Sequence, residues 1–187
     1  MDILKHLNWV DIVVAVIAIR IIFVSSQTGF VVEFLKLLAA VVAVFVSFHY
    51  FTGLAAVFVK VPLAPSVLHT VAFVLLWGMT LLICRFIRDG FLALFSVQAQ
   101  DGIDKWGAAV ISIGRVVVTA SVVMFVFLAT GQKYMETMTL SSFSSRYILA
   151  VSPNIYISGC DHVVTRLFPT EKKNPAVAQI MKSVAKK

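Results

Sequence analysis

Charged residues are scarce in this chain, and that scarcity excludes most soluble folds. Only 13% of the 187 residues are Asp, Glu, Lys or Arg, whereas soluble domains carry about 25%. Hydrophobic residues make up 60% of the chain, well above the roughly 45–50% that is usual in soluble domains. The composition therefore predicts an integral membrane protein.

Cysteine and recognisable catalytic motifs are also scarce. The two cysteines, Cys84 and Cys160, show no CxxC or metal-ligand spacing, so we expect neither a disulfide nor a thiolate metal site. His49 and His69 have no third ligand of suitable type nearby, which disfavours a metal centre. A phosphate-binding loop, an HExxH motif and a GxSxG motif are all absent from the sequence. The sequence therefore predicts no enzyme activity, no cofactor and no metal.

Long apolar runs are the most prominent feature that is present. A helix of about 20 apolar residues crosses the ~30 Å hydrocarbon core of a bilayer. Four such runs occupy Trp9–Val24, Phe30–Phe51, Val67–Ile83 and Trp106–Thr130. They predict an all-α membrane protein with a four-span membrane domain over residues 1–132. The turn-forming residues 25–29 predict that the first two spans form an antiparallel hairpin.

The remaining residues are too polar to span a membrane. Residues 133–169 show apolar positions at helical spacing among serines, which predicts an amphipathic helical segment. Ser152-Pro153 and Asn174-Pro175 each predict a helix start, because a capping residue precedes a proline. Residues 170–187 form a basic tail. We expect these parts to lie on the bilayer or against the bundle.

The net charge of +7 predicts contact with the lipid bilayer and not with nucleic acid, because no basic patch carries interleaved aromatic residues. Cytoplasmic flanks of membrane spans carry an excess of Lys and Arg. Six such residues belong to the first and third connections and their flanks, whereas the opposite side holds Lys5, Lys60 and Lys133. The six are Arg20, Lys36, Arg85, Arg88, Lys105 and Arg115. This asymmetry predicts that both termini lie outside the cytoplasm.

Five charged residues within or beside the apolar runs form a candidate intramembrane charge network: Asp11, Arg20, Glu33, Asp104 and Arg115. Arg115 lies about 13 Å into the fourth run, where an arginine costs at least ~2.5–3.5 kcal/mol. One interpretation is that these charges pair with one another, Arg115 with Glu33 in particular. The other is that Arg20 and Arg115 line an anion-binding or anion-conducting cavity, within one chain or between subunits.

Small residues mark three candidate helix-packing positions, Gly29, Ala108 and Ser112. Ala108 and Ser112 are four residues apart, on the stripe that joins Asp104 to Arg115. Small residues at this spacing allow a neighbouring helix to approach closely. We therefore expect this stripe to face another helix.

Several short motifs together resemble the colicin V production protein family of bacterial inner-membrane proteins, over roughly residues 8–132. The first run opens with an aromatic residue and an aspartate, as the family does, in WVD at residues 9–11. The sequence GFVVE at residues 29–33 matches a family signature, and the second run ends in the family's His-Tyr pair at residues 49–50. The fourth run begins with Asp104-Lys105 and carries small residues before Arg115.

This chain departs from the family pattern at four positions. Thr28 stands where the family has an arginine, and Ala108, Ser112 and Val116 stand where it has glycines. The resemblance implies a multi-pass protein of the bacterial inner membrane that is required for colicin V production or export. It implies a process and no molecular mechanism. Two hypotheses follow: an accessory factor for toxin production, secretion or envelope homeostasis that binds membrane partners or its own copies, or a small oligomeric anion channel or transporter subunit.

Overall fold

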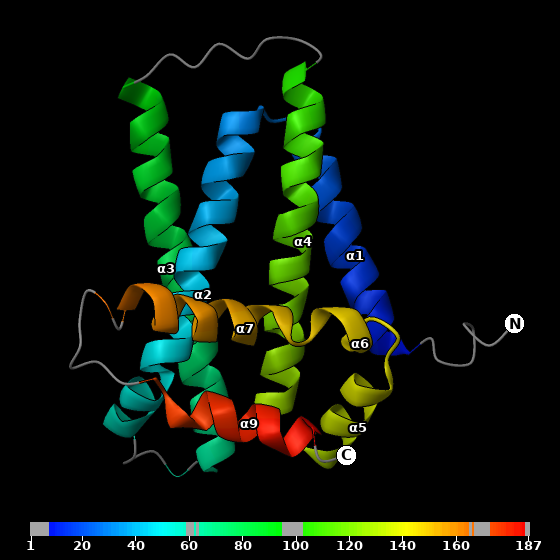
Figure 1. The fold of residues 1–187 in the computed structure, drawn as a ribbon, viewed down its shortest axis with the longest axis vertical. Coiled ribbons are helices and arrows are strands. Elements are labelled where there is room, and N and C mark those ends of the chain that lie inside the picture. The colour runs from blue at the N-terminus through cyan, green and yellow to red at the C-terminus, as the bar shows by residue number, and fades with distance from the viewer. Residues whose placement is uncertain are drawn as a thin grey trace, which may run out of the picture.

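The computed structural model describes residues 8–58, 62, 64–94, 103–164, 166 and 173–185, and every regular element within them is a helix (Figure 1). The fold class predicted from the sequence is thus confirmed as all-helical. The four long helices come first and the shorter ones follow. Their bounds are α1 Trp9–Ser25, α2 Phe30–Val57, α3 Pro65–Leu94, α4 Ile103–Ala129, α5 Lys133–Ser141, α6 Ser145–Ile148, α7 Val151–Gly159, the π-helical turn η2 Cys160–Val164, and α9 Pro175–Ala185.

Three helices are long and apolar enough to cross a membrane: α2, α3, and α4 from Asp104. The protein is therefore a multi-pass membrane protein. The fourth expected span, α1, forms a helix over the expected residues but has only 17 residues. At 1.5 Å per residue it is about 25 Å long, which is shorter than the ~30 Å hydrocarbon core. The count of four spans stays a prediction.

The long helices do not pack in the order of the sequence. α2 packs against α3 and α4, and α1 packs chiefly against α4 (Figure 1). The tight turn after α1 does reverse the chain, as predicted, but the main partner of α1 is α4 and not α2. Since α1 and α3 run in one direction and α2 and α4 in the other, the ends of α1 and α3 and the starts of α2 and α4 lie at one end of the bundle (Figure 1). We call it the connection end.

An aromatic cluster fills the bundle at the opposite end. Phe48, Phe73 and Phe125 come from α2, α3 and α4, and each is at most 1% exposed. Their ring centroids lie 4.5 Å apart for Phe48 and Phe125, and 5.0 Å apart for Phe48 and Phe73. Aromatic pairs at such separations stabilise a core beyond the area that they bury. The three spanning helices are therefore held together most firmly in this half.

The amphipathic segment predicted after residue 133 packs against the bundle. α7 crosses α2 and α4 at a steep angle (Figure 1). Two serines join α7 to α4: the Ser152 hydroxyl donates to the Val118 carbonyl at 3.0 Å, and the Ser152 N–H donates to the Ser121 hydroxyl at 2.8 Å. The prediction that Ser152 starts a helix was wrong. α7 begins at Val151, and Ser152 anchors it to α4 instead.

The start of α9 is fixed to the end of α2. Asn174 accepts from the N–H of Ala176, so it caps α9 as predicted, and its side-chain amide donates to the Phe48 carbonyl at 3.0 Å. The Asn174 N–H donates to the Tyr156 hydroxyl, which also lies 3.2 Å from His49 Nδ1. Burial raises the pKa of Tyr156 to about 12, so this hydroxyl stays protonated and able to donate. The predicted domain boundaries at residues 132 and 169 remain predictions.

Candidate anion-binding cavity

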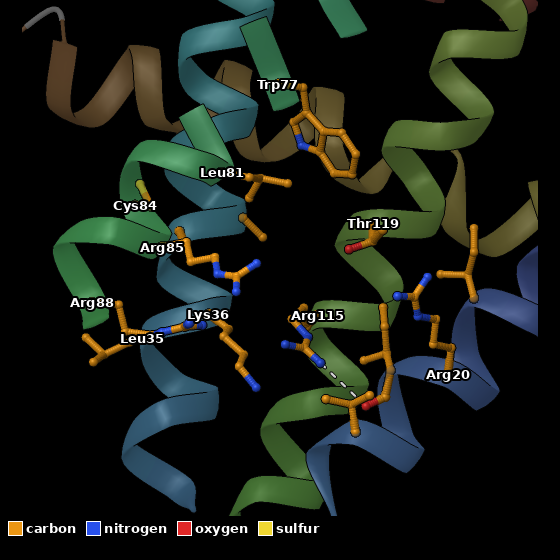
Figure 2. A pocket seen from close by; sticks show the side chains of 15 residues that line it. Arg20, Leu35, Lys36, Trp77, Leu81, Cys84, Arg85, Arg88, Arg115 and Thr119 are labelled. Atoms are coloured by element: carbon orange, nitrogen blue, oxygen red, sulfur yellow. Dashed lines mark hydrogen bonds between the residues drawn. The ribbon is translucent and has the colours of Figure 1, made fainter. Parts of the chain in front are cut away.

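A cavity of about 690 Å³ lies among the four long helices. Every residue that lines it belongs to α1, α2, α3 or α4 (Figure 2). Five of these lining residues are cations: Arg20, Lys36, Arg85, Arg88 and Arg115. We call them the cation cluster.

The cation cluster occupies the half of the cavity nearest the connection end. Arg20 lies five residues before the end of α1, and Lys36 lies six residues after the start of α2. Arg88 lies six residues before the end of α3. At 1.5 Å per residue these depths are all about 7–9 Å, and Arg85 and Arg115 lie deeper, at about 13 and 18 Å. The helix directions therefore bring cations of α1, α2 and α3 to similar depths, with Arg85 of α3 and Arg115 of α4 deeper in the cavity.

Glu33 is the buried carboxylate at the edge of this cluster. Its side chain has no exposed surface, and Arg115 Nη1 lies 3.2 Å from its Oε2. Lys36 Nζ donates to Oε1 at 2.6 Å, and the Thr28 hydroxyl donates to the same oxygen at 2.7 Å. The pair of Arg115 with Glu33 proposed from the sequence is present, and Lys36 and Thr28 join it. This position in the first turn of α2 also suits a carboxylate, because the helix dipole is positive there.

The cations outnumber the carboxylates that contact them. Arg88 lies 2.6 Å from Asp89, and Arg85 lies 3.7 Å from the same carboxylate, which is half exposed. Within the described residues Arg20 has no carboxylate partner. In this part of the chain five cations thus face two carboxylates, and three positive charges remain uncompensated. An excess of this kind attracts an anion.

Two donors on cavity-lining side chains lack acceptors among the described residues. Arg115 Nη2 donates to the Ile21 carbonyl at 3.4 Å (Figure 2), but the buried Arg115 Nε has no hydrogen-bond partner there. The buried Trp77 Nε1 has none either. Buried donors without partners cost about 1–3 kcal/mol each. The cavity walls therefore hold hydrogen-bonding capacity that the described part of the protein does not use.

The far half of the cavity is mostly apolar. Ala40, Trp77, Leu81 and Thr119 line it, and Figure 2 shows Trp77 and Leu81 at the end away from Arg88 and Arg115. The aromatic cluster of the fold follows directly, because Ala40 and Trp77 pack on it. The cavity is therefore cationic at the connection end and apolar toward the aromatic cluster.

The other two members of the predicted charge network lie elsewhere. Asp104 accepts the N–H of Phe30 at 2.9 Å, so it caps the first turn of α2 at the connection end. Asp11 accepts from the Ser144 hydroxyl at 2.6 Å and from the N–H groups of Asn8, Phe143 and Ser144. Asp11 thus fixes the start of α1 to the loop before α6. Of the predicted network, Arg20 and Arg115 line the cavity, and Glu33 contacts Arg115 beside it.

Three cavity cations were not recognised as site residues from the sequence. Lys36, Arg85 and Arg88 were used only to orient the protein in the membrane. The sequence did contain a signal for this site, because each of the three residues lies within about two to three turns of a helix end at the same side of the membrane. Their meeting in one cavity depends on the packing of α2 against α3, which the sequence pattern does not specify.

The predicted helix-packing residues are in close contact with neighbouring helices. Ala108 and Ser112 have no exposed surface, and the Ser25 hydroxyl at the end of α1 donates to the Ala108 carbonyl at 2.9 Å. This small-residue stripe therefore faces α1, as expected of a helix contact. Gly29 is the N-cap residue of α2, in an extended conformation. It precedes Phe30, whose ring lies against Gly107 of α4.

The described residues contain no group of three or more His, Cys, Asp or Glu side chains that would hold a metal ion. The chain matches no curated protein and no solved structure. It does match the family model described as colicin V production protein, over residues 10–153. That match covers most of the chain, from the second residue of α1 to the start of α7. The chain therefore belongs to the colicin V production protein family.

Proposed function

We propose that this protein binds an anion in the cavity between its four long helices, and that this binding is its contribution to colicin V production. The observation that carries the proposal is the cation cluster, in which five cations face two carboxylates among the described residues. Each cation held inside a membrane protein costs several kcal/mol unless it is paired or solvated. A bound anion would supply the missing partner.

The geometry favours binding over conduction. A conducting path would have to continue from the cavity to the opposite side of the membrane. The aromatic cluster of Phe48, Phe73 and Phe125 fills that route between α2, α3 and α4, and its rings are fully buried. An anion that enters from the connection end therefore meets a packed apolar wall. The channel hypothesis is the less favoured of the two.

The proposed setting is the bacterial inner membrane, with the connection end in the cytoplasm. The Lys and Arg asymmetry between the two ends supports this orientation. The protein would then act as an accessory factor in toxin production or export, or in envelope homeostasis. It would do so by binding and releasing an anion on the cytoplasmic side. Association with membrane partner proteins or with further copies of the chain belongs to the same proposal.

The test is the thermal stability of the purified protein in a neutral detergent, with chloride, sulfate, phosphate or pyrophosphate added at constant ionic strength. A ligand that binds only the folded state raises the melting temperature as its concentration exceeds Kd. We expect multivalent anions to stabilise the wild type and chloride not to. Arg20→Gln removes a cation without breaking an ion pair of the described residues and should weaken the effect, whereas Arg146→Gln, an exposed arginine on α6, should not.

Proteoliposomes made from the same preparation test the alternative. Anion-dependent conductance that Arg20→Gln reduces would establish the channel and overturn the binding-only proposal. Equal stabilisation by all anions, chloride included, would show that the cation cluster is not a site for multivalent anions. Cross-linking of the same proteoliposomes measures whether copies of the chain associate.

A further inference from the structure

The cavity has a cationic half and an apolar half, and the two together restrict the chemical class of the ligand more than the charge alone does. We propose that the ligand is a membrane lipid with a phosphate headgroup, its phosphate in the cation cluster and the start of its hydrocarbon chain in the apolar half. This inference rests on the proposed anion binding. It adds the chemical class of the anion.

The cationic half suits phosphate. Four of its five cations are arginines: Arg20, Arg85, Arg88 and Arg115. The guanidinium group binds phosphate oxygens through two parallel N–H donors. Three uncompensated positive charges match a phosphate monoester, which carries about −1.5 to −2 at neutral pH, better than a diester with a single negative charge. A terminal phosphate is therefore favoured over an internal one.

The apolar half suits a hydrocarbon chain. Ile17 of α1, Ala39 of α2, and Leu81 of α3 line the cavity beside the arginines, and Trp77 lines its far end. A small hydrophilic anion leaves such surface in contact with water, which is unfavourable by about 25 cal/mol per Å² of apolar area. A lipid covers this surface with methylene groups. The cavity volume of about 690 Å³ lies within the ~300–1,000 Å³ of small-ligand sites, so it accommodates a headgroup with the first part of a chain.

The helices that flank the cavity also face the bilayer. α1 packs against α4 and α5, and α3 packs against α2 and α4, so α1 and α3 form the two sides of the cavity without forming a packing interface with each other. Their outer surfaces carry exposed apolar side chains such as Ile19 at 68%, Phe23 at 65% and Ile87 at 67%. Such surfaces lie against lipid in a membrane protein. A lipid can therefore enter sideways from the bilayer, with its headgroup level with the cation cluster.

The first experiment compares lipids in neutral detergent by native mass spectrometry and thermal stability. The probes are phosphatidic acid, phosphatidylglycerol, phosphatidylcholine and inorganic phosphate. We expect phosphatidic acid to bind most tightly, about tenfold or more ahead of phosphatidylcholine, which corresponds to roughly 1.4 kcal/mol. Arg20→Gln should weaken the binding of phosphatidic acid about tenfold, and Arg146→Gln should change its Kd less than about twofold. Ala39→Phe, which fills the apolar half and leaves every cation, should remove the advantage of phosphatidic acid over inorganic phosphate.

The outcomes separate the two proposals. If inorganic phosphate stabilises the protein as well as phosphatidic acid does, anion binding stands and the lipid inference is overturned. If phosphatidylcholine binds as tightly as phosphatidic acid, the site does not discriminate a terminal anionic phosphate from a zwitterionic headgroup, and the lipid inference is overturned. If no phosphate-bearing probe binds above its chloride control, both proposals are wrong.

Cys84 gives a second measurement that leaves the cation cluster and the apolar half of the cavity unchanged. It lines the cavity between Leu81 and Arg85 and is partly exposed, whereas Cys160 is buried. Occupancy by phosphatidic acid should slow maleimide labelling of the Cys84 peptide severalfold, and phosphatidylcholine should not. Equal labelling rates in the two lipids would contradict the proposal even if Ala39→Phe fails to fold. Cys84→Ala identifies the labelled peptide.

Discussion

Arg115 of α4 lies 3.2 Å from Glu33 of α2, and this ion pair sits at the edge of the cavity. Lys36 shares the same carboxylate at 2.6 Å, so Glu33 balances two cations at once. Breaking a buried pair leaves an uncompensated charge. The pair therefore holds α2 and α4 together and also limits the positive charge that the cavity presents to a ligand.

Reversal of this pair should be destabilising in either single variant. Arg115→Glu and Glu33→Arg should each cost roughly 3–5 kcal/mol, because each leaves like charges in contact. The double swap should recover part of that loss only, since the arginine introduced on α2 would lie beside Lys36. Chemical denaturation of the purified proteins measures this. A double variant no more stable than the weaker single variant would show that the two side chains do not interact.

The small-residue stripe should tolerate no larger side chains. Ala108→Leu with Ser112→Leu inserts two bulky side chains where α4 contacts α1, and overpacking costs about 1–3 kcal/mol at each site. Membrane insertion should persist while the melting temperature falls. Val110→Leu with Ile113→Leu is the matched control, since those residues on the same helix are 67% and 56% exposed. Equal melting temperatures for the two double variants would place the stripe against lipid.

Asp11 should act as a structural anchor and not as part of the cavity. Asp11→Asn replaces one acceptor oxygen by a donor that faces the N–H groups of Phe143 and Ser144. We expect a loss of about 1–3 kcal/mol and faster proteolysis between α5 and α6. Binding of anions by the protein that remains folded should be unchanged. A selective loss of anion binding would return Asp11 to the charge network.

Docking of α7 should depend on Gly159. A methyl group there would overlap the ring of Phe45, so Gly159→Ala forces α7 away from α2. The resulting loss of contacts should lower the melting temperature and increase maleimide labelling of the nearby Cys160. Gly53→Ala is the matched control, because a methyl group at that position in α2 meets no atom within 4 Å. Alanine in place of glycine within a helix stabilises by about 0.5–1 kcal/mol, so this control should be neutral or more stable.

Orientation in the membrane is tested by reporter fusions after Lys133 and within residues 88–100. The excess of Arg and Lys at the connection end predicts a cytoplasmic signal from the second fusion and an external signal from the first. The opposite pair of signals would reverse the orientation. It would also place the cation cluster on the external side of the membrane.

The long helices were predictable from the sequence because their apolar runs are unambiguous, and the Arg115–Glu33 pair was predictable because both residues lie near the same side of the membrane. The sequence grouped Asp11 with these charges, whereas in the structure its carboxylate accepts hydrogen bonds from Phe143 and Ser144. Asp11 lies near the start of α1, at the end of the bundle opposite the other charges. Its partner Ser144 is 133 residues away in the sequence, so the contact appears only in the folded chain. The sequence left open whether the segment that forms α7 lies on the bilayer or against the bundle, and it predicted Ser152 as a helix cap and not as a contact to α4. Ser152 is buried because the backbone of α4 supplies a hydrogen-bond acceptor for its hydroxyl, the Val118 carbonyl.

The burial of α3 is uneven along its length, and this unevenness has a mechanical consequence. All of its buried residues, Leu68, Ala72 and Phe73, lie in its first third. Near the middle, a methyl group added at Gly78 would meet no atom within 4 Å, and the Thr80 hydroxyl donates back to the Leu76 carbonyl, a contact that often bends helices. The C-terminal two thirds of α3 can therefore tilt about the point where the helix is packed in the aromatic cluster. Arg88 lies about 22 Å from Phe73 along the helix axis. A tilt of α3 by about 10° at Phe73 would therefore move the Arg88 guanidinium by about 4 Å across the cavity.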